Sequence, residues 1–463
     1  MTTENETWAP VLTGSEGPLY RAIADAIARD VDAGRLAPGA RLPPQRTLAK
    51  ALGVDFTTIG RAYAEARSRG LVEGRVGQGT YVLAPRRTVG APAAASAVDL
   101  SMNLPPRFDD PALVERMWRE VAELGVSGLD ILLRYDEAGG ALADREAGAK
   151  WLSARLPGLA PGRLIVCPGV HGALLAAVGA LAGPGEAICG EALTYPGLRA
   201  ITAQLGVRLI GLAIDGEGVL PDAFEDACRR EAPKAFCCTP TLHSPTTATM
   251  SLARREAITQ IARRHGVPII EDDAYGMLAQ DAPRPLASLA PELTLYITGL
   301  AKCVSPALRI AYLAAPDARL GSRVKAAVRA TAVMASPLTA AIATRWIQSG
   351  TAGAVAGAIR AESQARQSLA ARILPAEAVK AHPDGFHLWL TLPERWTRGA
   401  FAGELRFCGV GVVASDAFSS LPSAPEAVRI GLGGPIGRPE VERALILIAE
   451  RLEDAPAASS AVV

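Results

Sequence analysis

The sequence lacks three features that would restrict its function at once: a net charge, a long apolar run and a regular spacing of cysteines. With a formal net charge of +1, the chain as a whole is neither an acidic nor a basic polyelectrolyte. No stretch of about twenty apolar residues occurs, and the polar first residues, MTTENETWAP, do not resemble a secretory signal. Internal repeats are also absent. We therefore expect a cytoplasmic, globular protein with no membrane partner, and its 463 residues allow two or three domains.

The cysteines show neither a metal-binding nor a disulfide pattern. None of them forms a CxxC pair, and the adjacent Cys237 and Cys238 suit neither a metal clamp nor a disulfide framework. We therefore expect no metal site. We interpret all seven cysteines as small hydrophobic residues: Cys167, Cys189, Cys228, Cys237, Cys238, Cys303 and Cys408.

The near-neutral total hides a basic region close to the N-terminus. Between Arg41 and Arg87, nine lysines and arginines oppose three acidic residues, so this stretch alone carries a charge of +6. The next residues, APRRTVGAPAAASAV, have no hydrophobic periodicity and are typical of a linker. The predicted division is a small basic domain over residues 1–84, a linker over 85–98, a large domain over 99–455 and a flexible tail over 456–463.

Local patterns in the small domain predict three helices followed by a hairpin. Apolar residues at helical spacing occupy residues 18–34, two prolines precede a short helix that ends at Gly53, and a third helix runs from Asp55 to Gly70. Two short strands around glycines follow in LVEGRVGQGTYVL. On the third helix, one set of residues is expected to face inward (Ile59, Ala62, Tyr63 and Ala66) and another outward (Thr57, Arg61, Ala64 and Ser68).

This order of elements predicts a winged helix-turn-helix, in which the third helix can enter the DNA major groove. The alternative is a small three-helix cap whose arginines only solvate it. The segment LPPQRTLAKALGVDFTTIGRAYAEARSRGLVEGRVGQGTYV resembles the DNA-binding module of the GntR family. One departure is Phe56, which stands where the family usually has arginine. The resemblance implies a set of DNA contacts: Arg46, Thr57, Thr58, Arg61, Arg75 and the wing residue Gly77.

The large domain alternates apolar, strand-like runs with helix-like segments. Runs such as RLIVCPG, EAICGE, VPIIEDD and LTLYITG are typical of buried strands, and helical patterns separate them. We therefore expect an α/β fold with a mainly parallel central sheet.

Within this domain, Lys302 lies in the otherwise apolar segment TGLAKCVSPALRIAYL. A lysine costs too much to bury unless it is paired, neutralised or used chemically. Because it follows a predicted strand, it should lie where open α/β sheets bind ligands. Desolvation there lowers the pKa of a lysine and frees its amine to form a Schiff base with an aldehyde. Pyridoxal 5'-phosphate is the obvious aldehyde.

Candidate partners for that cofactor occur after other predicted strands. Asp272 and Tyr275 in VPIIEDDAYG could pair with the pyridine nitrogen and the phenolic oxygen, although such a run is also typical of an ion-pair cluster or a metal site. The amides of Val170 and His171 begin a predicted helix, which suits a phosphate group. Two further side chains could stack on the ring or reach the phosphate, with packing and a salt bridge as the alternatives: Tyr195 and Arg309.

Together these segments resemble the fold-type I aminotransferases over roughly residues 99–453. The resembling motifs are CTPTLHSPTTATMS, EDDAY, LAKCVSPALR, GFHLWLTLP and VRIGLGG. The resemblance implies that Lys302 forms the internal aldimine, and that Arg429 grips the carboxylate of an amino-acid-like ligand. It also implies that the cofactor ring is held by Asp272, Tyr275 and Tyr195. The phosphate would be held by Arg309 and by the amides of Val170 and His171.

The motifs depart from the family where side chains tune the cofactor. The usual Asn is Ser244, the Gly after Pro-Thr is Thr247, and the usual serines before the lysine are Gly299 and Ala301. Ser244 and Thr298 are expected to contact the cofactor in place of the missing groups, with Thr246 as a further substitute.

A GntR-type domain joined to an aminotransferase-like domain resembles the MocR subfamily of bacterial regulators. The resemblance implies a head-to-tail homodimer on a double-stranded DNA operator and regulation in place of catalysis. An amino-acid-like effector would displace Lys302, form an external aldimine held by Arg429 and change the spacing of the DNA-binding domains. The regulated genes would serve amino acid or amine catabolism, and an ectoine-derived diaminobutyrate is the favoured effector on overall resemblance.

Two other functions stay open. One is a catalytically active, pyridoxal-phosphate-dependent aminotransferase with an attached DNA-binding domain, against which the replacements at Ser244, Gly299 and Ala301 argue. The other is a regulator that senses pyridoxal phosphate itself, against which Arg429 argues, because such a sensor needs no carboxylate clamp.

Overall fold

The computed structural model describes residues 8–10, 18–32, 35–36, 39–68, 71–75, 79–82, 98–126 and 129–454. These form two compact units, Met1–Ala94 and Ala95–Val463, which are described separately below. The predicted tail, residues 456–463, lies outside the described residues, as does the predicted linker except for Val98. Because Val98 begins a paired strand, the described part of the large unit starts one residue before the predicted boundary.

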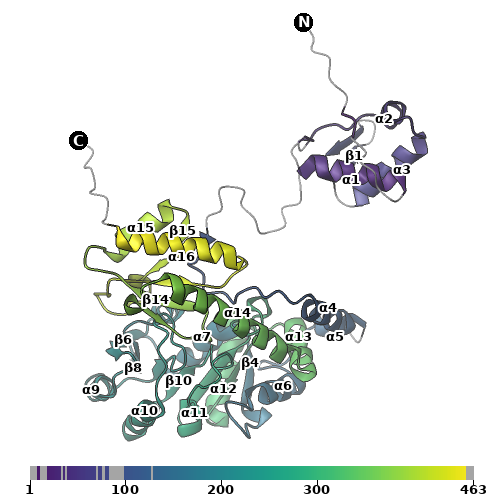
Figure 1. Ribbon diagram of the computed structural model, residues 1–463. Helices are drawn as coiled ribbons and strands as arrows, with labels where there is room; N and C mark the ends of the chain where they lie inside the picture. Colours follow the sequence, from purple (N-terminus) through teal and green to yellow (C-terminus); the bar gives the residue numbers. More distant parts are fainter. Residues whose placement is uncertain are drawn as a thin grey trace. The chain divides into compact units, whose positions relative to one another are not determined.

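The smaller unit has three helices and a hairpin, as predicted (Figure 1). Helices α1 (Leu19–Asp32) and α2 (Gln45–Leu52) pack on α3 (Phe56–Ser68), and β1 (Val72–Arg75) pairs antiparallel with β2 (Gly79–Val82). Gly53 adopts the left-handed conformation that ends α2. The predicted inward residues of α3 are all buried, but Leu19 at the start of α1 is 43% exposed.

The larger unit is built on a seven-stranded sheet. Its strands run in the order β4-β12-β11-β10-β9-β5-β6, and β12 is antiparallel to both of its neighbours while all other pairs are parallel. The strands are β4 (Leu164–Cys167), β5 (Ala187–Glu191), β6 (Arg208–Leu212), β9 (Phe236–Cys238), β10 (Ile269–Asp272), β11 (Thr294–Gly299) and β12 (Ala311–Ala314). This confirms the predicted α/β class with a mainly parallel sheet.

Helices cover both faces of this sheet (Figure 1). One face packs on α7 (Gly169–Leu181), α8 (Pro196–Gln204) and α12 (Ala318–Ala332). The opposite face packs on α6 (Leu142–Leu152), α9 (Pro221–Glu231), α10 (Leu252–His265), α11 (Leu286–Leu289) and α13 (Pro337–Ser349). Because both faces are buried, the strands are continuous apolar runs and do not alternate.

A second layer follows the long helix α14 (Thr351–Ile373). Strands β13 (Val379–Ala381), β14 (His387–Thr391), β17 (Ala427–Gly431) and β16 (Val413–Ala414) form an antiparallel sheet in that order. Helices α15 (Arg398–Phe407) and α16 (Arg438–Glu453) pack against it, and β3 (Val98–Asp99) pairs with β15 (Val410–Gly411). The remaining helices of this unit are α4 (Pro111–Val126) and the short α5 (Leu129–Leu132). Strands β7 (Ile214–Asp215) and β8 (Gly218–Val219) form a small hairpin.

All seven cysteines are free, and only Cys408 is more than marginally exposed. They therefore behave as the small hydrophobic residues that the sequence indicated. Among the described residues, no group of side chains is arranged to hold a metal ion. None of the described helices combines the length and the apolar character needed to cross a bilayer.

Candidate functional site

A cavity of about 490 Å³ opens at the carboxyl ends of the central strands of the large unit. Its volume lies within the range of about 300–1,000 Å³ that is usual for small-molecule sites. The end of β10, the end of β11 and the start of α7 form its floor, and residues of β16 and β17 close one side. The lining residues include Ser101, Met102, Asn103, Leu104, Val170, His171, Tyr195, Thr239, Ser244, Asp272, Tyr275, Gly299, Ala301, Lys302, Arg309, Val413, Phe418 and Arg429.

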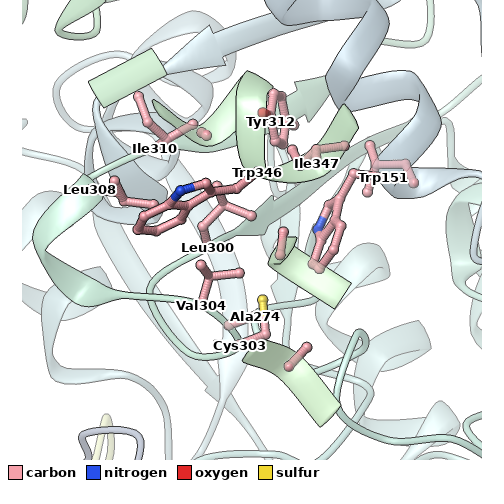
Figure 2. Close-up of a cluster of buried hydrophobic side chains, with 14 of the residues drawn as sticks. Trp151, Ala274, Leu300, Cys303, Val304, Leu308, Ile310, Tyr312, Trp346 and Ile347 are labelled. Carbon is pink, nitrogen blue, oxygen red and sulfur yellow. The ribbon is translucent and has the colours of Figure 1, made fainter. Parts of the chain in front are cut away.

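Lys302 lies in the turn after β11 and lines this cavity. The apolar residues around it have a separate role, because Leu300, Cys303 and Val304 are buried in the large hydrophobic core. Figure 2 shows these side chains packed among Trp151, Trp346 and their neighbours. The apolar stretch therefore anchors the turn, while its one lysine faces the site.

The amine of Lys302 is in a state suited to nucleophilic chemistry. Burial lowers the pKa of Lys302 to about 8, with a further lowering by Arg429 that Asp272 partly opposes. Nζ donates a hydrogen bond to the backbone oxygen of Asn103. A pKa near 8 leaves a substantial neutral fraction close to neutral pH, as Schiff-base formation requires.

Asp272 presents an unsatisfied carboxylate to the cavity. It is 7% exposed, and its Oδ1 has no hydrogen-bond partner among the described residues. Burial and the neighbouring Asp273 raise the pKa of Asp272 to about 7, although Lys302 lowers it. A buried acceptor without a partner suits a protonated pyridine nitrogen, which would supply both the donor and the opposite charge.

The two other acidic residues of the EDD run have structural roles. Asp273 accepts from Arg155 Nε at 3.1 Å and from the Tyr296 hydroxyl at 2.6 Å. Glu271 lies 3.8 Å from Arg255 and accepts the amides that begin α11. Because side chains alternate along a strand, the run places an ion-pair cluster on one side and Asp272 on the other.

The start of α7 forms a cradle for an anion. Gly169 has φ +78, and a Cβ atom there would lie 3.2 Å from Cζ of Arg309. The site therefore needs a glycine, which lets the guanidinium lie over the first turn of the helix, beside the backbone of Val170 and His171. A helix N-terminus together with an arginine is suited to a phosphate group.

Tyr195 caps the start of α8 and is 40% exposed at the cavity wall. Its hydroxyl lies 3.5 Å from Nδ1 of His171, and the two rings meet edge to face at 6.3 Å. A partly exposed ring in this place is available for stacking on a bound heterocycle.

Tyr275 is buried beside the lysine. Its hydroxyl accepts from Nδ2 of Asn103 at 2.7 Å, and its ring centroid lies 5.9 Å from Nζ of Lys302. Burial raises the pKa of Tyr275, so the phenol stays protonated. Ser244 also lines the cavity near this group.

Arg429, in β17, is the second buried cation of the site and is 9% exposed. Its Nη2 donates to the Ser101 carbonyl at 2.6 Å and its Nη1 contacts Ser244 Oγ at 3.5 Å, but its Nε has no partner. Burial lowers the pKa of Arg429, and no carboxylate among the described residues forms a salt bridge with it. A ligand carboxylate would supply an acceptor for the unpaired Nε and the opposite charge.

One predicted cofactor contact is not brought to the cavity. Thr298 is fully buried within β11, and its hydroxyl donates to the Asp273 carbonyl at 3.0 Å. Thr298 is not among the residues that line the cavity, and the prediction that it contacts the cofactor stays a prediction. Thr246 is likewise bonded elsewhere, to Nδ1 of His243 at 2.7 Å.

Sequence reasoning missed several residues of the site. The backbone oxygens of Ser101 and Asn103 contact the two functional cations, Arg429 and Lys302. Glu191, with its pKa raised to about 7 mainly by burial, binds the Thr239 amide at the cavity wall. Backbone contacts leave no residue-type signal. For Glu191, an acidic residue at the end of a buried strand was the available clue.

The smaller unit presents a polar surface on α2 and α3. Arg46, Thr57 and Arg61 are exposed and Thr58 is half-buried. The Arg46 guanidinium lies 6.0 Å from the ring of Phe56, and the Thr57 hydroxyl donates to Asp55. The Arg75 backbone lies in β1, but its side chain and Gly77 lie outside the described residues.

Comparisons with family models match both units. Residues 95–444 match the model for aminotransferase class I and II. Residues 19–82 match the model for bacterial regulatory proteins of the gntR family.

Similar proteins include some that are named as transcriptional regulators. The uncharacterized HTH-type transcriptional regulator YdeF of Bacillus subtilis is 28% identical over 453 residues, which cover 97% of both chains. The probable rhizopine catabolism regulatory protein MocR of Rhizobium meliloti is 26% identical over 65% of this chain and 66% of its own. An archaeal alanine:glyoxylate aminotransferase shares the fold, with a TM-score of 0.70 and 22% identity over 77% of this chain and 92% of its own.

Proposed function

The chain belongs to the family of class I and II aminotransferases and carries a GntR-family helix-turn-helix domain, and from this premise we propose that it is a pyridoxal-phosphate-dependent transcriptional regulator. It senses an amino-acid-like effector in the aminotransferase-like unit and binds operator DNA, in the cytoplasm, with the smaller unit. One observation carries the proposal. A half-buried lysine with a lowered pKa lines the same cavity as Asp272, whose buried Oδ1 has no hydrogen-bond partner among the described residues, in a chain whose other unit is a DNA-binding domain.

The residues of the cavity fit the cofactor. Lys302 would hold its aldehyde carbon and Asp272 its pyridine nitrogen, and Tyr195 would stack on the ring. The start of α7 and Arg309 would hold its phosphate. When bound, pyridoxal phosphate supplies an electrophilic carbon that reacts reversibly with amines.

Arg429 gives the site its preference for amino acids. A buried, unneutralised guanidinium is costly unless a ligand supplies the negative charge, so a carboxylate should bind with high selectivity. The amino group of the same ligand would compete with Lys302 for the cofactor. The regulated genes would then serve catabolism of an amino acid or amine, and the candidate suggested by the sequence was an ectoine-derived diaminobutyrate.

The departures from the aminotransferase motifs favour sensing over catalysis. Gly299 and Ala301 line the cavity where the family usually has serines, and Ser244 replaces an asparagine. Fewer hydrogen bonds would therefore hold the cofactor, although Lys302 and Asp272 remain. Relatives named as transcriptional regulators support the same conclusion.

We also propose that the protein is a head-to-tail homodimer. A surface near α4 and α5 exposes large apolar side chains, among them Trp118 (74% exposed), Leu133 (69%) and Tyr135 (86%). Two hollows adjoin it, lined by residues 132–138 and by residues of α12 and the segment that follows. Exposed apolar clusters of this kind mark interaction surfaces, and a second copy of this chain is the occupant proposed here.

The proposal is tested first by the near-ultraviolet and visible absorbance of the purified protein after addition of pyridoxal phosphate. We expect a visible band that is absent from the Lys302→Ala variant and retained in Lys380→Ala, a control at an exposed lysine. Amino acids are then screened for a change in the band and in operator affinity. No band in the unaltered protein would overturn the proposal.

Incubation with an amino acid and a keto acid separates the regulator from its alternative. A stable spectral change without product supports a sensor. Many turnovers per protein molecule would instead identify a working aminotransferase with an attached DNA-binding domain.

A further inference from the structure

The charges that line the cavity restrict the side chain of the ligand. Among the described lining residues, four are acidic or basic side chains: Asp272, Lys302, Arg309 and Arg429. The imidazole of His171 also lines the cavity, but burial and the nearby Arg309 lower its pKa, which favours its neutral form. The proposed function assigns the first three to the cofactor and the fourth to the ligand carboxylate. No charged group remains for a ligand side chain.

Besides its polar contacts with Ser101 and Ser244, Arg429 has several apolar neighbours. Val413 is its cross-strand partner, and the ring of Phe418 lies 4.8 Å from its guanidinium carbon. Met102 follows directly on Ser101, whose carbonyl Arg429 contacts, and Met102 is 56% exposed at the cavity. Leu104 lines the same side. A ligand held here by its carboxylate has apolar groups beside its side chain.

We infer that the effector is an α-amino acid with an uncharged, apolar side chain, an inference that rests on the proposed function. A side-chain ammonium would lie near Arg429 and Lys302 without an anion to pair with, and it would lose its hydration. A side-chain carboxylate would find no unused cation. This points away from diaminobutyrate as the effector.

Two nearly isosteric ligands test the inference: norvaline and 2,4-diaminobutyrate, which differ mainly in a terminal methyl or ammonium group. Each is titrated into the cofactor-loaded protein while the visible band is followed. We expect norvaline to change the band at a concentration at least about tenfold lower. Equal or tighter binding of diaminobutyrate overturns the inference but leaves the proposed function intact. Absence of the band overturns the proposed function itself.

A charge introduced at the cavity mouth provides the reciprocal test. Met102→Asp should narrow or reverse the preference by favouring diaminobutyrate, whereas Met102→Asn, similar in shape but neutral, should not. If both variants behave alike, the apolar lining does not set the preference and the inference fails.

Residues 98–106 follow the linker from the DNA-binding unit and are called here the connecting segment. Its Asn103 and Ser101 carbonyls accept from Lys302 and Arg429, the two cations that a ligand would engage. Asn103 also donates to Tyr275. Thus the first described residues after the linker are bonded to the functional groups of the cavity.

Glycines let this segment lie tightly against the end of β17. A Cβ atom at Gly433 would lie 1.7 Å from the Leu104 carbonyl oxygen, and one at Gly431 would lie 2.8 Å from that of Met102. The Gly431 amide donates to Leu100, and Leu100 donates to Gly411. A displacement of Arg429 or Lys302 would therefore shift the backbone of the connecting segment.

We propose that the connecting segment transmits ligand occupancy to the linker, and this too rests on the proposed function. Asp99 lies outside the cavity lining and holds the turn that aims the Ser101 carbonyl, since its Oδ1 accepts from the Ser101 amide at 2.9 Å and from its hydroxyl at 2.5 Å. Changing Asp99 should therefore loosen the segment without removing a cavity side chain.

The test compares Asp99→Ala with Asp109→Ala, the same change at an exposed position farther along the chain. Operator affinity is measured with and without ligand, and ligand affinity is followed by absorbance. We expect the effect of ligand on operator affinity to fall at least threefold in Asp99→Ala, while ligand affinity changes less. An undiminished effect overturns the proposal, as does a parallel loss of ligand affinity. If the ligand has no effect on the unaltered protein, the proposed function fails.

Discussion

The two units place their functional cations in opposite environments. In the large unit, Arg429 is buried and Lys302 is half-buried, and desolvation lowers the pKa of each. In the small unit, Arg46 and Arg61 are exposed on α2 and α3. Each arrangement suits a different partner: a small ligand is bound through a few desolvated groups, whereas the DNA polyanion attracts exposed charges over long distances.

The difference extends to the packing behind each site. The small unit needs only enough core to hold α3, with Ile59 and Tyr63 buried beneath it. The large unit surrounds Lys302 with the apolar residues shown in Figure 2, because a single cation must be held in one position. A substitution in one unit should therefore leave the properties of the other unchanged.

The largest effect is expected for the paired change Arg46→Ala and Arg61→Ala. If each side chain contributes a phosphate or base contact worth about 1–3 kcal/mol, operator affinity should fall at least ~30-fold. The visible band should be unchanged, because the pocket is not touched. Fluorescence anisotropy with labelled operator measures the loss, and Arg21→Ala on α1 is the control. Unchanged affinity would mean that α3 does not face DNA.

Asp272→Asn should weaken cofactor binding by about 10–100-fold, because an amide cannot supply the charge-assisted hydrogen bond worth about 1.5–3 kcal/mol. Titration of the visible band measures the affinity. Asp281→Asn, at an exposed carboxylate in the same unit, should have no effect. Operator affinity in the absence of cofactor should be the same for both variants. Equal cofactor affinity would remove Asp272 from the site.

The rate of cofactor addition should rise about tenfold between pH 7 and pH 9 and then level off. The reacting form is the neutral amine, and Lys302 has a pKa of about 8. Its neutral fraction therefore rises steeply up to about pH 8 and is nearly complete by about pH 9. An ordinary lysine would keep gaining reactivity beyond pH 10. Stopped-flow absorbance gives the profile, and a rise that continues past pH 10 would contradict the burial argument.

The smallest effect is expected for Asp55→Ala. Asp55 precedes α3, and its Oδ1 accepts from the Thr57 amide at 2.8 Å, so it caps the helix. The small unit should unfold a few degrees lower, and the large unit at its original temperature. Asp55→Asn keeps a capping oxygen and should recover most of the loss. Calorimetry distinguishes the two transitions, and a shift in both would show that the units do not unfold independently.

The sequence by itself determined the elements and the identity of the main groups. Helical spacing identified α1 to α3, apolar runs identified the buried strands, and the unusual position of Lys302 indicated a ligand site. These signals are local: each depends on residues a few positions apart, where periodicity and residue type are informative. Local patterns do not decide whether an individual strand residue reaches the cavity, and Thr298, expected to contact the cofactor, is not among the lining residues.

The tertiary structure alone decided which distant groups meet. The contacts of Lys302 with Asn103 and of Arg429 with Ser101 join segments far apart in the chain, and each uses a backbone oxygen that every residue possesses. Packing also brings Arg309 close to Gly169. It likewise decides that Arg46 is exposed while Arg429 is buried. Burial sets the pKa and availability of a charged group, and burial is a property of the folded chain.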